Sequence, residues 1–197
     1  MSIPRILLFA GSVRSGAYSG RTADCAAREL ALQGAEVTRI SLADYPLPIM
    51  DEDLQAEKGV PENAYRLARL IAAHDAVLIC TPEYNGSVPP LLKNTIDWVS
   101  RISRDNGRPL RPFPGKVAAL CSSSSGHFAG IRAIAHLRAV LCQIGMEVIS
   151  PQVSVPNGAE AFEESGAFKE ERLRKGMERL CGTLLEHARL FSERVES

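Results

Sequence analysis

Residues 9–23, FAGSVRSGAYSGRTA, combine glycine, serine and arginine at close spacing directly after a short apolar run. Glycine allows tight turns, serine hydroxyls donate hydrogen bonds, and an arginine guanidinium binds an anion through two parallel hydrogen bonds. A helix that begins in this stretch would add its N-terminal N–H groups and the positive end of its dipole. The pattern predicts a phosphate-binding loop made by Ser12, Arg14, Ser15, Gly16, Ala17, Ser19 and Gly20.

This loop differs from two other kinds of phosphate loop. It lacks the lysine and the spacing of GxxxxGK[ST], which excludes a nucleotide-hydrolysing P-loop. It also lacks the close G-x-G spacing of a dinucleotide fingerprint. A helix cap without any ligand is the alternative interpretation of the same residues.

Two further stretches combine turn-forming residues with polar or aromatic side chains. In TPEYNGSVPPLLKNTIDWVSR (81–101), the backbone of Pro82, Glu83, Tyr84 and Asn85 could face the polar edge of a flat ring. CSSSSGHFAGIRAIAHLR (121–138) allows another close approach, at Ser122, Ser123, Ser124, Ser125 and Gly126. The alternatives are a turn in which Tyr84 only covers the core, and a flexible surface linker. Together with the phosphate loop, the two stretches predict a mononucleotide whose phosphate and ring are bound separately.

Regular elements must position these loops, and hydrophobic periodicity predicts where they lie. Short apolar runs predict five strands, at residues 5–11, 35–42, 75–81, 116–124 and 147–155. Helical spacing predicts helices at residues 19–32, 62–74, 91–102, 131–144 and 168–195. Pro61 is expected in the first turn of the second helix. The segment 46–61, rich in proline and acid, is expected to be a surface loop without regular structure.

Strands that alternate with helix-sized segments predict an α/β fold with parallel strands and right-handed crossovers. The nearly continuous apolar character of the strands indicates a doubly wound sheet with helices on both faces. A length of 197 residues fits a single domain over residues 1–197. Ligands of such sheets lie beyond the carboxyl ends of the strands, which is where all three loops begin.

Composition narrows the classes of function. The chain has 23 basic and 23 acidic residues, so no overall field favours nucleic acid or an anionic membrane. The sequence shows neither a secretory signal nor an apolar run of the roughly 20 residues that span a bilayer. The five cysteines are widely spaced, which excludes CxxC motifs and predicts buried free thiols in a reducing cytoplasm.

The chain resembles the NAD(P)H-dependent FMN reductase family of flavodoxin-like proteins, near its bacterial quinone and chromate reductase branch. TPEYNGSVPPLLKNTIDWVSR is similar to the family signature PEYN-x-S-x-P-x-x-LKN-x-IDW almost residue for residue. GSVRSGAYSG resembles the phosphate loop GS-x-R-x-x-S-x-N, with Ala17 and Ser19 in place of serine and asparagine. SSSSGHFAGIRA resembles S-x-G-x-x-G-G-x-R-A, with Ala129 in place of a glycine.

The resemblance implies bound FMN, a five-stranded sheet in the order 2-1-3-4-5, and homodimers or homotetramers. It also implies ping-pong hydride transfer from NADPH or NADH to FMN and on to quinones, flavins, azo compounds or oxidised metal ions such as chromate. No catalytic side chain and no metal are expected, because the flavin carries the chemistry. A flavodoxin-type electron carrier is the main alternative, but such carriers dock protein partners through an acidic surface, whereas this chain is neutral. A flavin-free sensor or structural protein is a further alternative.

Several other residues allow two interpretations. His127 lies in a flavin-facing loop and is either exposed to solvent or a proton donor. Lys93 and Asp97, four residues apart on a helix, fit an exposed ion pair or an oligomer contact. Trp98 and Ile102 either pack inside their own subunit or offer apolar surface to a two-fold partner that completes the acceptor pocket.

Overall fold

The computed structural model describes residues 3–195, with side chains described up to residue 191. Its main sheet has five parallel strands in the order β2-β1-β3-β6-β7. These strands are β1 (Arg5–Ala10), β2 (Glu36–Ile40), β3 (Ala76–Pro82), β6 (Val117–Ser123) and β7 (Glu147–Val155). This confirms the predicted doubly wound, flavodoxin-like order, in which β6 and β7 are the fourth and fifth strands of the sheet.

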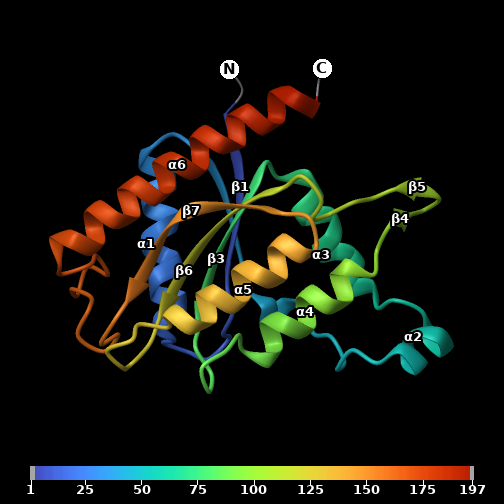
Figure 1. The fold of residues 1–197 in the computed structure, drawn as a ribbon, viewed down its shortest axis with the longest axis horizontal. Coiled ribbons are helices and arrows are strands. Elements are labelled where there is room, and N and C mark those ends of the chain that lie inside the picture. Colours follow the sequence, from blue (N-terminus) through green and yellow to red (C-terminus); the bar gives the residue numbers. More distant parts are fainter. Residues whose placement is uncertain (1–2, 196–197) are drawn as a thin grey trace.

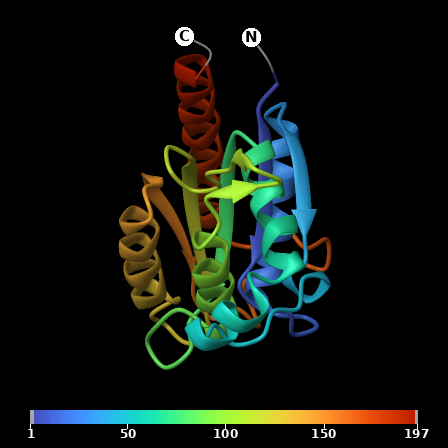
Figure 2. The ribbon, with the colours of Figure 1, turned by 90° about the vertical axis from the view of Figure 1, so that its right-hand side faces the viewer.

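Helices cover both faces of this sheet (Figures 1 and 2). One face packs against α1 (Tyr18–Leu32) and α6 (Glu171–Val195). The other face packs against α3 (Glu62–Ala73), α4 (Pro90–Ser100) and α5 (Ile131–Gln143). The observed bounds of β7 match the predicted ones, and those of the other predicted elements differ by at most three residues at either end.

Alternation of side chains along the strands explains the two layers. In β1, Ile6 and Leu8 face α1 and α6, whereas Leu7 and Phe9 face the opposite helices. All four side chains are buried, so β1 is apolar on both faces and reads as a continuous hydrophobic run.

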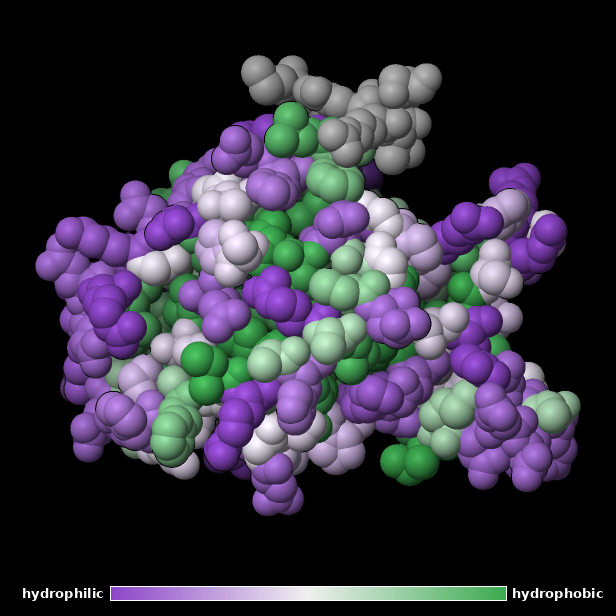
Figure 3. Space-filling view, in the orientation of Figure 1, coloured by the Kyte–Doolittle hydropathy of each residue, from purple (hydrophilic) through white to green (hydrophobic). Residues whose placement is uncertain are grey.

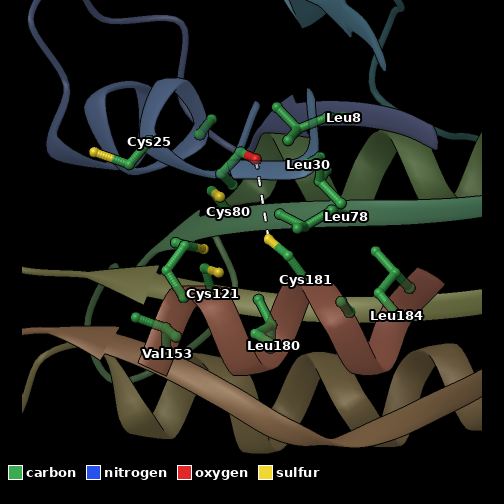
Figure 4. Packing of buried hydrophobic residues seen from close by; sticks show 14 of the residues in the cluster. Leu8, Cys25, Leu30, Leu78, Cys80, Cys121, Val153, Leu180, Cys181 and Leu184 are labelled. Atoms are coloured by element: carbon green, nitrogen blue, oxygen red, sulfur yellow. Dashed lines mark hydrogen bonds between the residues drawn. The ribbon is translucent and has the colours of Figure 1, made fainter. Parts of the chain in front are cut away.

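The core beneath α1 and α6 contains buried thiols (Figure 4). Cys80 and Cys121 are neighbours across β3 and β6, and the Cys181 thiol lies 4.0 Å from the Ala26 carbonyl oxygen. Burial raises the pKa of the Cys181 thiol. The expectation of buried free thiols is confirmed for Cys25, Cys80, Cys121 and Cys181 and is wrong for Cys142, which is exposed.

The expectation for segment 46–61 is wrong over seven residues, because α2 (Glu52–Lys58) forms there. The Asp51 carboxylate accepts hydrogen bonds from the N–H groups of Asp53 and Leu54, and Gly59 ends the helix with φ 76°. Acidic residues in the first turn and Lys58 in the last complement the helix dipole. The surrounding prolines limit the length of this helix but do not prevent it.

Other local predictions also need correction. Pro61 precedes α3 as its N-cap residue, with ψ 144°, rather than lying in its first turn. A short 3₁₀ helix (Leu42–Asp44) follows β2. A small antiparallel hairpin, unpredicted from the sequence, joins β4 (Arg104–Asp105) to β5 (Arg108–Pro109) and projects from the body (Figures 1 and 2).

Trp98 and Ile102 do not form an apolar surface for a partner. The Trp98 side chain is 0% exposed, and its indole N–H donates to the Pro48 carbonyl oxygen over 2.8 Å. Ile102 is buried in the same core. Both residues therefore stabilise their own subunit, with Trp98 also tying α4 to the segment before α2.

Hydrophilic residues cover the projecting hairpin and alternate with apolar patches between α6 and α5 on the face shown in Figure 3. Within the described residues, no helix is both long enough and apolar enough to cross a membrane.

Candidate cofactor pocket

The loops that follow β1, β3 and β6 emerge at one edge of the sheet, at the bottom of Figure 1. They enclose a pocket of about 170 Å³. Ten of the predicted residues line it: Ser12, Arg14, Ala17, Ser19, Pro82, Glu83, Tyr84, Ser123, Ser124 and Ser125. The three stretches that the sequence singles out therefore meet in one place, as parallel strand ends require.

The first wall of the pocket is the start of α1. Its N-cap residue is Ala17, with no capping side chain and no acidic residue in the first turn. The first N–H groups of a helix have no partner within the helix, so this end carries a partial positive charge. Arg14 is exposed beside it, and the Arg14 backbone N–H donates to the Ser12 hydroxyl over 3.3 Å. The arrangement suits an anion.

Two residues that line this pocket carry a buried hydroxyl that has no hydrogen-bond partner among the described residues. The hydroxyls are Ser19 Oγ and Ser123 Oγ, from residues that are 1% and 2% exposed. Buried polar atoms are normally satisfied, and an unsatisfied one destabilises the fold by about 1–3 kcal/mol. A bound ligand with polar oxygens would remove this penalty. These residues therefore fit a phosphate ester such as FMN.

The second wall is a tight turn after β3. Tyr84 and Ser87 exchange two backbone hydrogen bonds of 3.1 and 3.0 Å around Asn85 and Gly86. Both central residues have positive φ, 50° and 79°, as in a type I′ turn. Tyr84 is exposed rather than packed into the core, which argues against the interpretation that it only covers the core. The turn holds an aromatic ring at the pocket without burying it.

Glu83 makes the strongest contacts of this loop. Its carboxylate accepts hydrogen bonds from the Arg132 side chain and from the N–H groups of Arg132 and Ala133. Burial alone would raise the pKa of Glu83, but the Arg132 guanidinium and the two N–H groups outweigh it, and the pKa is lowered. Glu83 is thus held as an anion between the turn and α5.

The third wall follows β6, where successive serines point to opposite sides. Ser122 Oγ donates to the Ala129 carbonyl oxygen at 2.6 Å and lies 3.0 Å from Ser154 Oγ, whereas Ser123 is one of the residues that line the pocket. Ala129 has φ 56°, a left-handed conformation that an alanine side chain disfavours. This is the position at which the resembled motif carries glycine.

Tyr18 lines the pocket but is not among the predicted residues. Its ring lies against Gly158, in the segment after β7. The Gly158 N–H donates to the Ser124 carbonyl oxygen over 2.9 Å, which joins this segment to the third wall. An aromatic residue at the first position of a helix beside Arg14 was an available signal for Tyr18, whereas no local pattern indicates Gly158.

The other predicted residues lie in the same three stretches of sequence but are not part of the pocket lining: Ser15, Gly16, Gly20, Asn85, Ser122 and Gly126. His127 is exposed, with its ring edge-on to that of Phe128. The Lys93 ammonium lies 2.9 Å from both Asp97 carboxylate oxygens on the surface of α4, which confirms an ion pair.

A larger hollow, of about 330 Å³, lies away from the three loops, between the end of α4 and residues 111–114. Its lining is mostly apolar, and it includes Ile102, Phe113 and Ile144. Its lining includes neither the uncapped start of α1 nor the two serines with unpartnered hydroxyls, Ser19 and Ser123. Size alone therefore does not make it the cofactor site. In the described part of the chain, no cluster of His, Cys, Asp and Glu could hold a metal ion.

Comparison with known proteins agrees with this geometry. Residues 4–160 match the family described as NADPH-dependent FMN reductase. The NAD(P)H-dependent FMN reductase PA1204 of Pseudomonas aeruginosa is 35% identical over 173 residues, covering 87% of this chain and 88% of that protein. A quinone reductase of Escherichia coli is 39% identical over 138 residues, covering 70% and 69%.

A solved structure is also similar. FerB, a flavoenzyme NAD(P)H:(acceptor) oxidoreductase from Paracoccus denitrificans, has a TM-score of 0.79 and 27% identity. The match covers 96% of this chain and 99% of FerB. The chain therefore belongs to the NADPH-dependent FMN reductase family, and it is an oxidoreductase that uses FMN with NAD(P)H as its electron donor.

Proposed function

We propose that the pocket at the carboxyl edge of the sheet holds FMN, and that the enzyme reduces quinones at the expense of NADPH or NADH. The observation that carries this proposal is the convergence of three loops on one pocket with two unpartnered hydroxyls and an uncapped helix start. The start of α1 and Arg14 would bind the phosphate, with Ser12 and Ser19 adding hydroxyls. The turn at Tyr84 would support the ring.

Bound FMN would supply the redox chemistry by accepting a hydride from NAD(P)H and passing electrons to the acceptor. The protein then has to bind, orient and exclude water. The backbone N–H groups of Glu83 and Asn85 and the Ser123–Ser125 stretch would supply hydrogen-bond donors along the ring, and Tyr84 would restrict water at its edge. Donor and acceptor would use one open face in turn, which is a ping-pong scheme.

Quinones are favoured as acceptors by the apolar side chains exposed around the loops. Such side chains occur in all three stretches: Val13, Tyr84, Phe128 and Ile131. A planar, largely apolar acceptor would remove this surface from water. Free flavins and azo compounds share that chemistry, whereas chromate is an oxyanion that gains nothing from it. The names of the relatives called quinone reductase support a quinone as acceptor.

We also propose that a second copy of the chain completes the acceptor pocket. The loops of one subunit come from one edge of one sheet, and the pocket residues Arg14 and Tyr84 are exposed to solvent. Light scattering together with activity on dilution tests this. An isologous homodimer, alone or paired into a homotetramer, should lose activity as it dissociates. A fully active monomer would refute the shared pocket.

We place this activity in the cytoplasm. The support is the set of free, mostly buried thiols in the described residues, since such thiols persist in reducing compartments.

The proposed reaction is tested by oxidation of NADPH and of NADH with a naphthoquinone, free FMN and chromate as acceptors. Purified protein should carry a yellow flavin spectrum and should reduce the quinone fastest. Binding of flavin without any NAD(P)H oxidation would contradict the proposed activity, and faster reduction of chromate than of quinone would contradict the proposed acceptor.

A further inference from the structure

The Glu83 carboxylate connects two parts of the site that are far apart in the sequence. Its Oε2 accepts from the N–H of Arg132 at 3.2 Å and from the N–H of Ala133 at 3.4 Å. Its Oε1 accepts from Arg132 Nε at 2.8 Å and from the Arg132 Nη2 group. Both oxygens are therefore engaged on α5, about 50 residues away along the chain.

Helix α5 has no other cap for these groups. Its N-cap residue is Gly130, with φ 79°, and the first turn contains no acidic residue. The first N–H groups of a helix need external acceptors, and a carboxylate there also interacts favourably with the dipole. Glu83, in the loop after β3, thus caps the start of α5, for which the loop after β6 supplies no capping side chain.

A second contact holds the far end of the same turn. Ser87 Oγ lies 3.0 Å from His136 Nδ1, one helical turn beyond Arg132. The turn also lies close to the guanidinium, since a Cβ at Gly86 would be 3.8 Å from Arg132 Nε. The residues on either side of Tyr84–Gly86 are therefore fixed to one face of α5.

The burial of the pair is asymmetric. The Glu83 side chain is 8% exposed, whereas the Arg132 side chain is 58% exposed and lies over the Phe128 ring at 5.5 Å. A buried, charge-assisted contact of this kind is stronger than an exposed ion pair. Loss of the Glu83 carboxylate would leave two helix N–H groups and one cation without their acceptor.

We propose that Glu83 is a positioning residue of the reductase: it fixes the turn that supports the ring against α5 and so sets where the ring lies relative to the third loop. The inference rests on the proposed function, because it assigns the ring to these loops. It does not require the Glu83 side chain to touch the flavin, and Glu83→Ala is expected to retain FMN.

The test compares Glu83→Ala and Glu83→Gln with the control Glu171→Ala. Glu171 is an acidic residue that lies within the first turn of α6 and pairs with Lys175 at 2.8 Å, outside the pocket lining. The measurements are kcat and KM with NADPH and a naphthoquinone, and the visible circular dichroism of the bound flavin, which reports the environment of the ring.

Glu83→Ala should lower kcat about tenfold, because a small misplacement of reacting groups is costly, while KM for NADPH changes about twofold or less. Its flavin dichroism should change. Glu83→Gln should lower kcat less, since its amide oxygen still accepts from the helix N–H groups. Glu171→Ala should match the parent in all three measurements.

An unchanged kcat and an unchanged flavin dichroism in Glu83→Ala would overturn the inference, even if its thermal stability falls. Equal loss of kcat in Glu171→Ala would also overturn it. Failure of the proposed function is distinguishable from both, because the parent protein itself would then lack flavin binding or NADPH oxidation.

Discussion

Tyr18 packs its ring against the backbone of Gly158, so closely that a Cβ at position 158 would lie under 3.0 Å from three Tyr18 carbon atoms. Tyr18 is the first residue of α1 and lines the pocket. Gly158 belongs to a segment that the same helix holds elsewhere, since Arg28 donates to the Gly166 carbonyl oxygen over 2.7 Å. The segment after β7 therefore helps to place the start of α1.

Gly158→Ala should displace Tyr18 and weaken FMN binding about tenfold. The clash involves Cβ, Cγ and Cδ2 of Tyr18, which lie close to the backbone and cannot move aside as the end of a flexible side chain can. Titration of apoprotein with FMN, followed by flavin fluorescence, measures this. Adding Tyr18→Ala should remove the contacts with Cγ and Cδ2 and leave only the contact with Cβ, so Gly158→Ala should weaken binding less in the Tyr18→Ala background than in the parent. Strictly additive losses would contradict the contact.

The sequence allowed the meeting of the three loops to be predicted, because it follows from strand periodicity and parallel connections. The order of the strands in the sheet was implied by the family resemblance alone. The sequence did not indicate that Ser123 lines the pocket while Ser122 does not, since that depends on which face of β6 each residue occupies. The contact of Gly158 with Tyr18 depends on tertiary packing and has no local pattern.

Helix α2 was not predicted, although the sequence contains signals for it. Asp51 as N-cap, acidic residues after it and Gly59 at the end are sequence signals for a short helix. The prolines at positions 46, 48 and 61 favour an irregular loop and so point the other way. By contrast, Asn85-Gly86 is a strong signal for a type I′ turn, and it was available in the signature itself.

Arg14→Ala should weaken FMN binding about ten- to a hundredfold, because a charge-assisted hydrogen bond contributes about 1.5–3 kcal/mol. Arg14 is exposed and holds no ion pair among the described contacts, so folding should be little affected. Arg172→Ala, at an exposed arginine of α6, is the control. Equal affinity of the Arg14 variant and this control would exclude Arg14 from phosphate binding.

Substitutions of the pocket serines should affect the stability of the apoprotein and its affinity for FMN differently. Ser19→Ala and Ser123→Ala remove buried hydroxyls without partners, so the apoprotein should unfold at the same or a higher temperature. Both should weaken FMN binding about two- to tenfold. Ser122→Ala is the control, because its hydroxyl has two partners and its loss should destabilise the apoprotein by about 1–3 kcal/mol. A stability loss in all three variants would show that the two hydroxyls are satisfied in the apoprotein.

Substitutions at Asn85 test whether the Tyr84–Ser87 turn supports the flavin ring. The φ of 50° at Asn85 is accessible to glycine and inaccessible to proline, whose ring fixes φ near about −65°. Asn85→Gly should retain FMN within about threefold, whereas Asn85→Pro should break the Tyr84–Ser87 hydrogen bonds and lose most of the affinity. Similar FMN retention by the two variants would place the ring away from this turn.

Ala129→Gly should stabilise the protein by about 1 kcal/mol, because it relieves a left-handed alanine at φ 56°. Chemical denaturation of the apoprotein measures the change. Ala133→Gly, within α5, is the matched control and should destabilise by about 1 kcal/mol through its lower helix propensity. Destabilisation by both changes would show that position 129 is not strained.

A crystal structure of the FMN complex tests the central claim most directly. We predict the phosphate at the start of α1, within hydrogen-bond distance of Arg14 and Ser19, and the ring between the Tyr84–Ser87 turn and the Ser123–Ser125 stretch. The Ser123 hydroxyl should have gained a partner in that complex. Flavin in the apolar hollow lined by Ile102, Phe113 and Ile144, with the pocket beside Arg14 left free, would contradict the account.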